Sequence, residues 1–376
     1  MTASSFRTFA RHEWFLACAA ASSLIFLVFG HVLSQQLSNP VGFAVVFAWL
    51  FASVLGAAIG VVRHADHLAV RLGEPYGTLI LTLAVTFIEV ISISAVMVHG
   101  ANNPTLVRDT LFAVVMIILN GMVGLSLLLG AWRHQEQTYN LQGANSYLGV
   151  IIPLVVLSLL LPNYTVTTPG PFLSVAQQMF LVLVSVGLYA TFLMMQTGRH
   201  RRYFRMDDET HAHAHDHASA PGDAPAHPLL LHAVMLLAYM VPVVFLAEHL
   251  AKPIDYLVEE LEAPAALGGV IMAVLVATPE AIGAVRAAMA NHIQRSVNIF
   301  LGSVLSTIGL TIPAMLIVSH MTGRNIELGV EHTDVVLLML TLAVSVVTFA
   351  SGRTNVIQGA VHLILFGVYV LLIVQG

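Results

Sequence analysis

Two long apolar segments of this chain each carry a glutamate near the middle. Glu89 lies in the run GTLILTLAVTFIEVISISAVMV and Glu280 in the run LGGVIMAVLVATPEAIGAV, and each glutamate follows a glycine, Gly77 or Gly268, by twelve residues. Such segments are long enough to cross the roughly 30 Å hydrocarbon core of a bilayer, which takes about 20 apolar residues. An ionisable side chain at that depth is costly and usually lies on an ion or proton path. The segments therefore predict a membrane protein with a functional site at two carboxylates.

The composition of the whole chain also indicates a membrane protein. Of the 376 residues, 57% are hydrophobic and 9% are charged, and the mean hydropathy is +0.85. Continuous apolar runs indicate helices, because lipid offers no partner to backbone N–H and C=O groups, and the weak alternation of a membrane barrel is missing. We predict an all-α polytopic fold with eleven transmembrane helices, near residues 14–35, 40–62, 76–99, 109–131, 146–162, 172–196, 229–250, 265–289, 296–320, 333–351 and 354–375.

Several classes of function do not fit the sequence. The net charge is −5 and basic residues are thinly spread, so a nucleic-acid partner is not expected. Cys18 is the sole cysteine, which excludes an intramolecular disulfide and a CxxC motif. No GxxxxGK[ST] loop for ATP and no HExxH zinc motif is present. We expect no cofactor and no enzymatic reaction, and the partners to be inorganic cations, protons and the lipid bilayer.

The basic residues indicate how the helices are oriented. With a cytoplasmic N-terminus and eleven crossings, twelve arginines fall on the inner side, and only Arg108, Lys252 and Arg324 fall on the outer side. Positive residues gather in cytoplasmic loops of membrane proteins. We therefore expect an integral protein of a bacterial inner membrane, with the N-terminus in the cytoplasm and the C-terminus in the periplasm.

The chain divides around its one long polar stretch. Residues 198–228 are expected to form a cytoplasmic linker rich in histidine and acidic residues, between a first five-helix repeat at 37–197 and a second at 229–376. Residues 1–36 then form an extra N-terminal helix. Arg108 precedes Asn120 by twelve residues, and Arg295 precedes Thr307 by the same distance. Five crossings are an odd number, so tandem units would form an inverted repeat, the arrangement in which transporters place their sites between repeats.

Polar residues recur on one face of the helix that carries Glu89. Thr78, Thr82, Thr86, Glu89 and Ser92 are spaced by four, four, three and three residues. Small hydroxyl residues also serve as packing contacts between membrane helices, so that interpretation stays open for the hydroxyls. In the second segment, Pro279 cannot donate to the Leu275 carbonyl, which is either a cation ligand or part of a simple kink. The predicted cation- and proton-binding residues are Glu89, Glu280, Thr82, Thr86, Ser92, Asn120, Leu275, Thr278, Asn298, Ser303, Ser306 and Thr307.

Carboxylates surrounded by hydroxyl and amide oxygens suit a hard cation. Ca²⁺ fits two charges, and Na⁺ or K⁺ fits if fewer charges are engaged. A buried carboxylate that loses its cation gains by taking a proton, so cations and protons compete. Competition at a site that opens to one side at a time predicts antiport without ATP.

At these residues the chain resembles the calcium/cation antiporter superfamily, in particular the bacterial ChaA-like branch of the cation/proton exchangers. The strongest local matches are LGEPYGTLILTLAVTFIEV at 72–90 and ATPEAIGAVRAAMANHIQRSVNIFLGSVLSTIGLTIPAML at 277–316. The resemblance implies two inverted five-helix halves with Glu89 and Glu280 as paired binding carboxylates. It implies exchange of Ca²⁺, with Na⁺ or K⁺ as further substrates, for H⁺. Many relatives carry Gly-Asn-Ala-x-Glu, but Thr86 and Ala277 occupy the asparagine positions here.

Two further hypotheses concern histidines and alternative functions. His211, His213, His215 and His217 form a candidate regulatory metal site, or simply belong to a flexible linker. His362 in the last helix is interpreted as a hydrogen-bonded packing residue. The alternatives to the leading function are a Na⁺- or K⁺-selective proton antiporter without calcium transport, and a His-rich metal-sensing membrane protein.

Overall fold

The computed structural model describes residues 13–73, 76–100, 103–198, 200–204 and 229–375, with side chains for all of these except residues 70 and 76–78. Among them, eleven helical segments are long and apolar enough to span a membrane, which confirms the predicted all-α fold and its eleven helices. These spans are Trp14–Ser38, Pro40–Ala69, Leu79–His99, Leu106–His134, Leu141–Tyr164, Val175–Thr197, Leu229–Glu260, Ala266–Met289, Ile293–Thr322, His332–Phe349 and Val356–Gln375.

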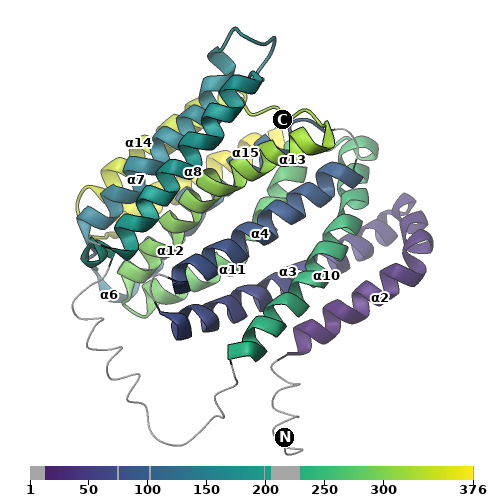
Figure 1. Ribbon diagram of the computed structural model, residues 1–376, viewed down its shortest axis with the longest axis horizontal. Coiled ribbons are helices and arrows are strands. Elements are labelled where there is room, and N and C mark those ends of the chain that lie inside the picture. Colours follow the sequence, from purple (N-terminus) through teal and green to yellow (C-terminus); the bar gives the residue numbers. More distant parts are fainter. Residues whose placement is uncertain (1–12, 74–75, 101–102, 199, 205–228, 376) are drawn as a thin grey trace, which may run out of the picture. The chain divides into compact units, whose positions relative to one another are not determined.

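The chain forms two compact units, and the first comprises Met1–Leu106 and His227–Pro279. It contains α2 (Trp14–Gln35), α3 (Pro40–Leu72), α4 (Tyr76–His99) and α10 (Leu229–Asp255). Helix α10 packs along α3, and both α2 and α4 pack against this pair (Figure 1). Helix α3 runs to Leu72, well past the predicted end at residue 62. Its N-terminus is capped by Asn39, whose side chain accepts a hydrogen bond from the Val41 N–H, and Gly73 at φ +64° ends it.

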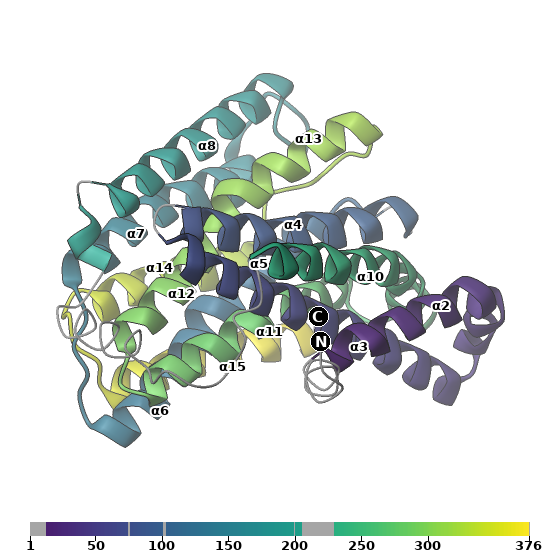
Figure 2. The same ribbon diagram turned by 60° about the horizontal axis from the view of Figure 1, so that its bottom comes forward.

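The second unit comprises Val107–Ala226 and Glu280–Gly376. Helix α5 (Leu106–Met116) continues through the π-helical segment η2 (Ile117–Met122) into α6 (Val123–His134). Figure 2 shows α8 (Val175–Thr197) beside α7 (Leu141–Val155) and α13 (Ile312–Thr322), in agreement with their contacts. The second unit also contains α12 (Ile293–Ser306), α14 (His332–Phe349) and α15 (Val356–Gln375). Two further π-helical segments belong to it: η3 (Val156–Leu160) continues α7, and η7 (Thr307–Thr311) joins α12 to α13.

Helix α11 (Ala266–Met289) belongs in part to each unit: its residues up to Pro279 lie in the first unit, and its residues from Glu280 onward lie in the second.

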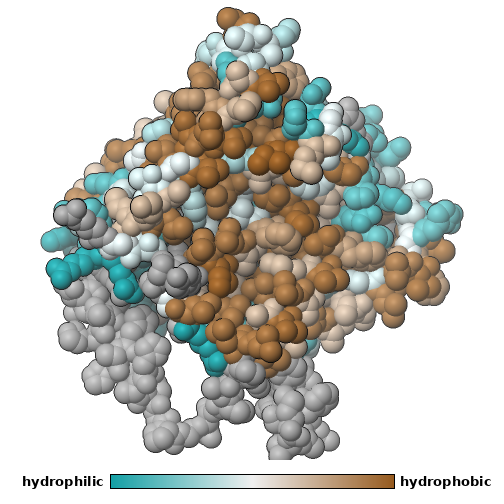
Figure 3. All heavy atoms as spheres, viewed as in Figure 1, coloured by the Kyte–Doolittle hydropathy of each residue, from teal (hydrophilic) through white to brown (hydrophobic). Residues whose placement is uncertain are grey.

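Apolar side chains are exposed along the helices, as expected for a surface that faces lipid. Hydrophobic residues dominate the face shown in Figure 3. On α8 alone, Met179, Phe180, Leu183 and Met194 are all more than 60% exposed. Water would disfavour so much exposed apolar surface on a soluble protein, whereas the hydrocarbon core of a bilayer accepts it. The protein is therefore an integral membrane protein.

Candidate functional site

The polar face predicted on α4 is buried in the structure. Glu89 is 1% exposed, Thr86 and Ser92 are also buried, and Thr82 is half-buried. The hydroxyl oxygens of Thr86 and Ser92 have no hydrogen-bond partner within the described part of the chain. A buried hydroxyl without a partner costs about 1–3 kcal/mol, so these groups suit contact with a ligand. The side chain of Thr78 lies outside the described residues.

The second candidate carboxylate, Glu280, lies on α11 and is half-buried. The Ser303 hydroxyl, which comes from α12, donates a hydrogen bond to Glu280 Oε2. Ser306 donates in turn to the Ser303 carbonyl oxygen at 2.9 Å. The structure therefore brings together three of the predicted site residues within the second unit.

The proline beside Glu280 leaves α11 unbroken. Pro279 lies inside the helix Ala266–Met289, and because it has no N–H it cannot donate to the carbonyl of Leu275, a buried residue. The Thr278 hydroxyl donates to the Val274 carbonyl at 2.5 Å, and its oxygen keeps lone pairs that can still accept or coordinate. Both predicted ligands therefore remain chemically able to bind a cation.

Asn120 and Thr307, which share the twelve-residue spacing from an arginine, both lie in π-helical segments. Asn120 belongs to η2 (Ile117–Met122), and Thr307 begins η7 (Thr307–Thr311). Both side chains are buried. π-Helical turns are rare and occur frequently at functional sites, because they interrupt the regular ladder of backbone hydrogen bonds. Each of the two spans therefore has a local irregularity that includes one of these two residues.

Two predicted amide ligands are engaged by other parts of the second unit. Asn120 Nδ2 donates to Thr341 Oγ1 at 2.8 Å, and Asn120 Oδ1 lies 3.3 Å from His362 Nδ1. Asn298 Nδ2 donates to the Phe204 carbonyl at 2.8 Å, and its oxygen accepts from Gln294 at 3.0 Å. These contacts hold each amide in a defined orientation. His211, His213, His215 and His217 lie outside the described residues.

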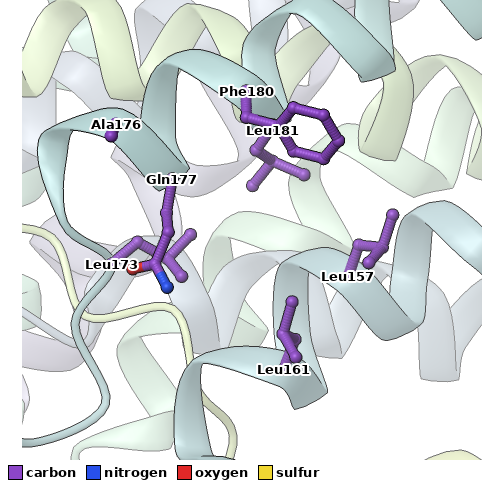
Figure 4. A pocket seen from close by; sticks show the side chains of 7 residues that line it. All are labelled: Leu157, Leu161, Leu173, Ala176, Gln177, Phe180 and Leu181. Carbon is purple, nitrogen blue, oxygen red and sulfur yellow. The ribbon is translucent and has the colours of Figure 1, made fainter. Parts of the chain in front are cut away.

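An apolar pocket in the second unit has the wrong chemistry for a cation. It lies between α8 and the end of the α7 span, and Figure 4 shows aliphatic and aromatic side chains around it. Its one amide, Gln177, takes part in the cap at the start of α8, where its oxygen accepts from the Ser174 N–H at 2.8 Å. The lining residues are Leu157, Leu161, Leu173, Ala176, Gln177, Phe180 and Leu181.

An ionic cluster around the buried side chains of Arg108 and Asp109 was not anticipated from the sequence. Arg108 donates to Asp109 at 2.8 Å and to Glu327 at 2.9 Å, and a third carboxylate, Glu331, lies 3.4 Å away. The Arg108 guanidinium also donates to the Gly329 carbonyl at 3.2 Å. The cluster ties the start of α5 to the segment between α13 and α14. Arg108 is more than 200 positions away from Glu327 and Glu331, and no local sequence signal pairs it with them.

A protein-family model supplies the family of the chain. The model described as sodium/calcium exchanger protein matches residues 14–198 and 231–375. This chain belongs to that family. The match includes both candidate carboxylates and leaves out the polar stretch between the two matched regions. The family is one of secondary cation transporters, which confirms the resemblance stated from the sequence.

Relatives and solved structures agree with this membership. A Sinorhizobium fredii protein, y4hA, named provisionally as an ionic transporter, is 43% identical to this chain. The matched region covers 92% of this chain and 91% of that protein. The sodium-potassium/proton antiporter ChaA of Escherichia coli is 38% identical over 94% of this chain and 96% of its own. The solved structure of native YfkE has the same fold, with a TM-score of 0.73, 18% identity and coverage of 96% of this chain and 100% of that one.

Proposed function

We propose that this protein is a secondary antiporter that exchanges Na⁺ and K⁺ for protons, and that Glu89 and Glu280 carry the exchanged ions in one cycle. The observation that carries the proposal is Glu89, a carboxylate 1% exposed in an apolar span, on the same helix face as the buried hydroxyls of Thr86 and Ser92. Such a group is costly inside a membrane and is expected to serve ion or proton movement.

The chemistry of the carboxylates accounts for the coupling. A buried carboxylate is stabilised either by a cation or by a proton, so release of one favours uptake of the other. Ser303 donates to Glu280 and can support its charged form, while the Leu275 carbonyl and the hydroxyls of Thr86 and Ser92 supply neutral oxygen ligands. Access from one side at a time then converts this competition into antiport.

The ligand set favours monovalent cations. Thr86 and Ala277 occupy the positions at which the family resemblance implies asparagine in many relatives, so two amide oxygens are missing here. Ca²⁺ takes six to eight oxygen ligands, whereas a weakly charged site with fewer oxygens suits Na⁺ or K⁺. The Escherichia coli relative, at 38% identity, is named as a sodium-potassium/proton antiporter.

Calcium exchange is the second candidate. A Bacillus subtilis relative named as a Ca²⁺/H⁺ antiporter is 19% identical over 84% of this chain. Two carboxylates would supply the charge that Ca²⁺ prefers. We assign Ca²⁺ the second place because the more similar relative is named for monovalent cations.

The orientation is also part of the proposal. The twelve-to-three distribution of basic residues supports a cytoplasmic N-terminus and a periplasmic C-terminus in a bacterial inner membrane. The sodium/potassium and proton movements would then connect the cytoplasm with the periplasm.

Proton flux in everted membrane vesicles tests the function. With a pH gradient imposed, addition of Na⁺ or K⁺ should dissipate it in vesicles that contain the protein, and Ca²⁺ should act more weakly. Glu89→Gln and Glu280→Gln should each abolish the response, because an amide can neither take up a proton nor supply a negative charge. Glu136→Gln is the matched control, since Glu136 is exposed and lies 3.6 Å from Arg353 outside the spans. Unaltered flux in both glutamine variants would overturn the proposal.

A further inference from the structure

Four buried side chains form a continuous polar chain inside the second unit. Asn120 on η2 donates to Thr341 on α14 at 2.8 Å and lies 3.3 Å from His362 Nδ1 on α15. The other ring nitrogen, His362 Nε2, lies 3.0 Å from Thr348 Oγ1 on α14. Asn120, Thr341 and His362 are fully buried and Thr348 is nearly so. Three helical segments from distant parts of the sequence therefore meet at the Asn120 amide.

The hydrogen-bond donors and acceptors of these four side chains can all be paired in one arrangement. Asn120 uses its NH₂ group toward Thr341, so its oxygen faces His362 and the ring must present Nδ1–H. The Leu119 backbone also hydrogen-bonds to His362. Nε2 is then the acceptor in a neutral ring, and Thr348 donates to it. Thr341, having accepted from Asn120, can donate to Met116 Sδ at 3.7 Å.

We propose that His362 is a positioning residue for the transported cation: through Nδ1–H it fixes the direction of the Asn120 amide oxygen. This inference rests on the proposed function and on the prediction from the sequence that Asn120 is one of its cation-binding residues. An amide oxygen has two lone pairs, so one hydrogen bond from His362 leaves the other available to a cation. Groups one step away from a ligand often set its orientation and thereby the affinity of the site. Loss of the Nδ1–H contact would free the amide to rotate.

Two substitutions at His362 separate positioning from packing. The amide nitrogen of Asn reaches the place of Nδ1, whereas the amide of Gln reaches the place of Nε2. His362→Asn therefore keeps the contact with Asn120 and loses that with Thr348, and His362→Gln does the reverse. We expect His362→Gln to raise KM for Na⁺ and K⁺ about five- to tenfold, the effect of one lost hydrogen bond. In the His362→Asn variant, which keeps the contact with Asn120, KM should stay within about twofold of that of the unmodified protein.

Thr341 and Thr348, the two ends of this row of hydrogen-bonded side chains, provide a second pair of variants. Thr341→Val removes the partner of the Asn120 NH₂ group and should raise KM, as His362→Gln does. Thr348→Val has the same change of shape but acts on the far side of the ring, and should leave KM unchanged. If the His362 variants fail to accumulate in the membrane, this pair decides the question. Equal effects of Thr341→Val and Thr348→Val, or of the Asn and Gln variants at His362, would overturn the inference.

A variant of Asn120 itself distinguishes the inference from the function on which it rests. Asn120→Ala should raise KM for Na⁺ and K⁺ at least as much as His362→Gln. If Asn120→Ala raises KM and His362→Gln does not, the positioning role alone fails. If Asn120→Ala leaves KM unchanged, the role of Asn120 in cation binding fails, and the positioning role with it. The exchange itself is judged separately by the glutamate variants.

Discussion

Ser303 illustrates how a single residue supports a carboxylate inside a membrane protein. Its hydroxyl, projecting from α12, donates to Glu280 on α11. A serine on a helix often gives its hydroxyl to the backbone four residues earlier, as Ser146 does with the Gln142 carbonyl at 2.6 Å. Ser303 instead donates to a carboxyl group on a neighbouring helix, a contact that would stabilise the charged form of Glu280. A hydrogen bond to a charged group contributes about 1.5–3 kcal/mol, more than one between neutral groups.

Removal of this hydroxyl should weaken cation binding. We expect Ser303→Ala to raise KM for the cation about tenfold, because Glu280 would lose a hydrogen bond to its charged form. Cation-dependent proton flux in vesicles measures KM. Ser146→Ala is the control, since its hydroxyl bonds to its own helix, and its KM should remain that of the unmodified protein. An unchanged KM in Ser303→Ala would show that the contact does not matter for binding.

Glycine contacts determine how closely helices approach in the second unit. A Cβ atom added to Gly359 on α15 would lie 2.5 Å from the Leu128 backbone nitrogen and 2.9 Å from the Gly124 carbonyl oxygen of α6. Backbone atoms inside a helix cannot move aside without disturbing the helix. Small residues of this kind let membrane helices pack backbone to backbone.

Substitution of Gly359 should therefore destabilise the protein. We expect Gly359→Ala to lower the Tm of the detergent-solubilised protein, because α6 and α15 would have to separate. Gly367→Ala on the same helix is the matched control, since an added Cβ there meets no atom of the described structure within 4 Å. That control should keep or slightly raise Tm, because alanine favours a helix by about 0.5–1 kcal/mol. Equal Tm values for both variants would contradict close packing at Gly359.

An ionic contact attaches the start of α2 to two other helices of the first unit. Glu13 Oε2 accepts from Arg63 at 2.5 Å and from Tyr239 at 2.8 Å, and it lies 3.3 Å from His64 Nε2. Burial opposes the charge on Glu13, but the hydrogen bond from Tyr239 and the positive charge of Arg63 outweigh it. The pKa of Glu13 is therefore held below its usual value of 4.5.

The stability of this attachment should depend on pH. Because the pKa is lowered in the folded state, the contribution of Glu13 is fully present above its ordinary pKa and is lost as the pH falls through the lowered value. We expect Glu13→Gln to lower Tm at pH 7, with a gap to the unmodified protein that narrows as the pH is taken below 4.5. Thermal unfolding in detergent over that range measures the gap. A gap that stays constant with pH would contradict the ionic contact.

At the scale of the whole molecule, the polar linker falls in the gap between the two regions that match the family model. The matched regions end at residue 198 and resume at residue 231, so the intervening stretch lies outside the part shared with the family model. A segment outside the shared part is not expected to carry the shared function. It remains a candidate for regulation through His211, His213, His215 and His217.

Deletion of residues 207–227 should leave exchange intact. We expect cation-dependent proton flux to keep its maximal rate, because the eleven spans and both candidate carboxylates remain. A Gly/Ser segment of the same length in place of residues 207–227 controls for the shortened connection. Complete loss of transport in a deletion protein that inserts correctly would assign an essential role to the linker.

The sequence by itself determined the eleven spans and the burial of Glu89 with its hydroxyl neighbours, since apolar length and helical spacing are local properties. It also indicated the family through two local matches. Only the tertiary structure decided that Ser303 contacts Glu280, that Arg108 joins Glu327, and that Asn120 meets His362. Each of these contacts joins a helical segment to a part of the chain distant in sequence, and spacing along one helix carries no information about which segments pack together.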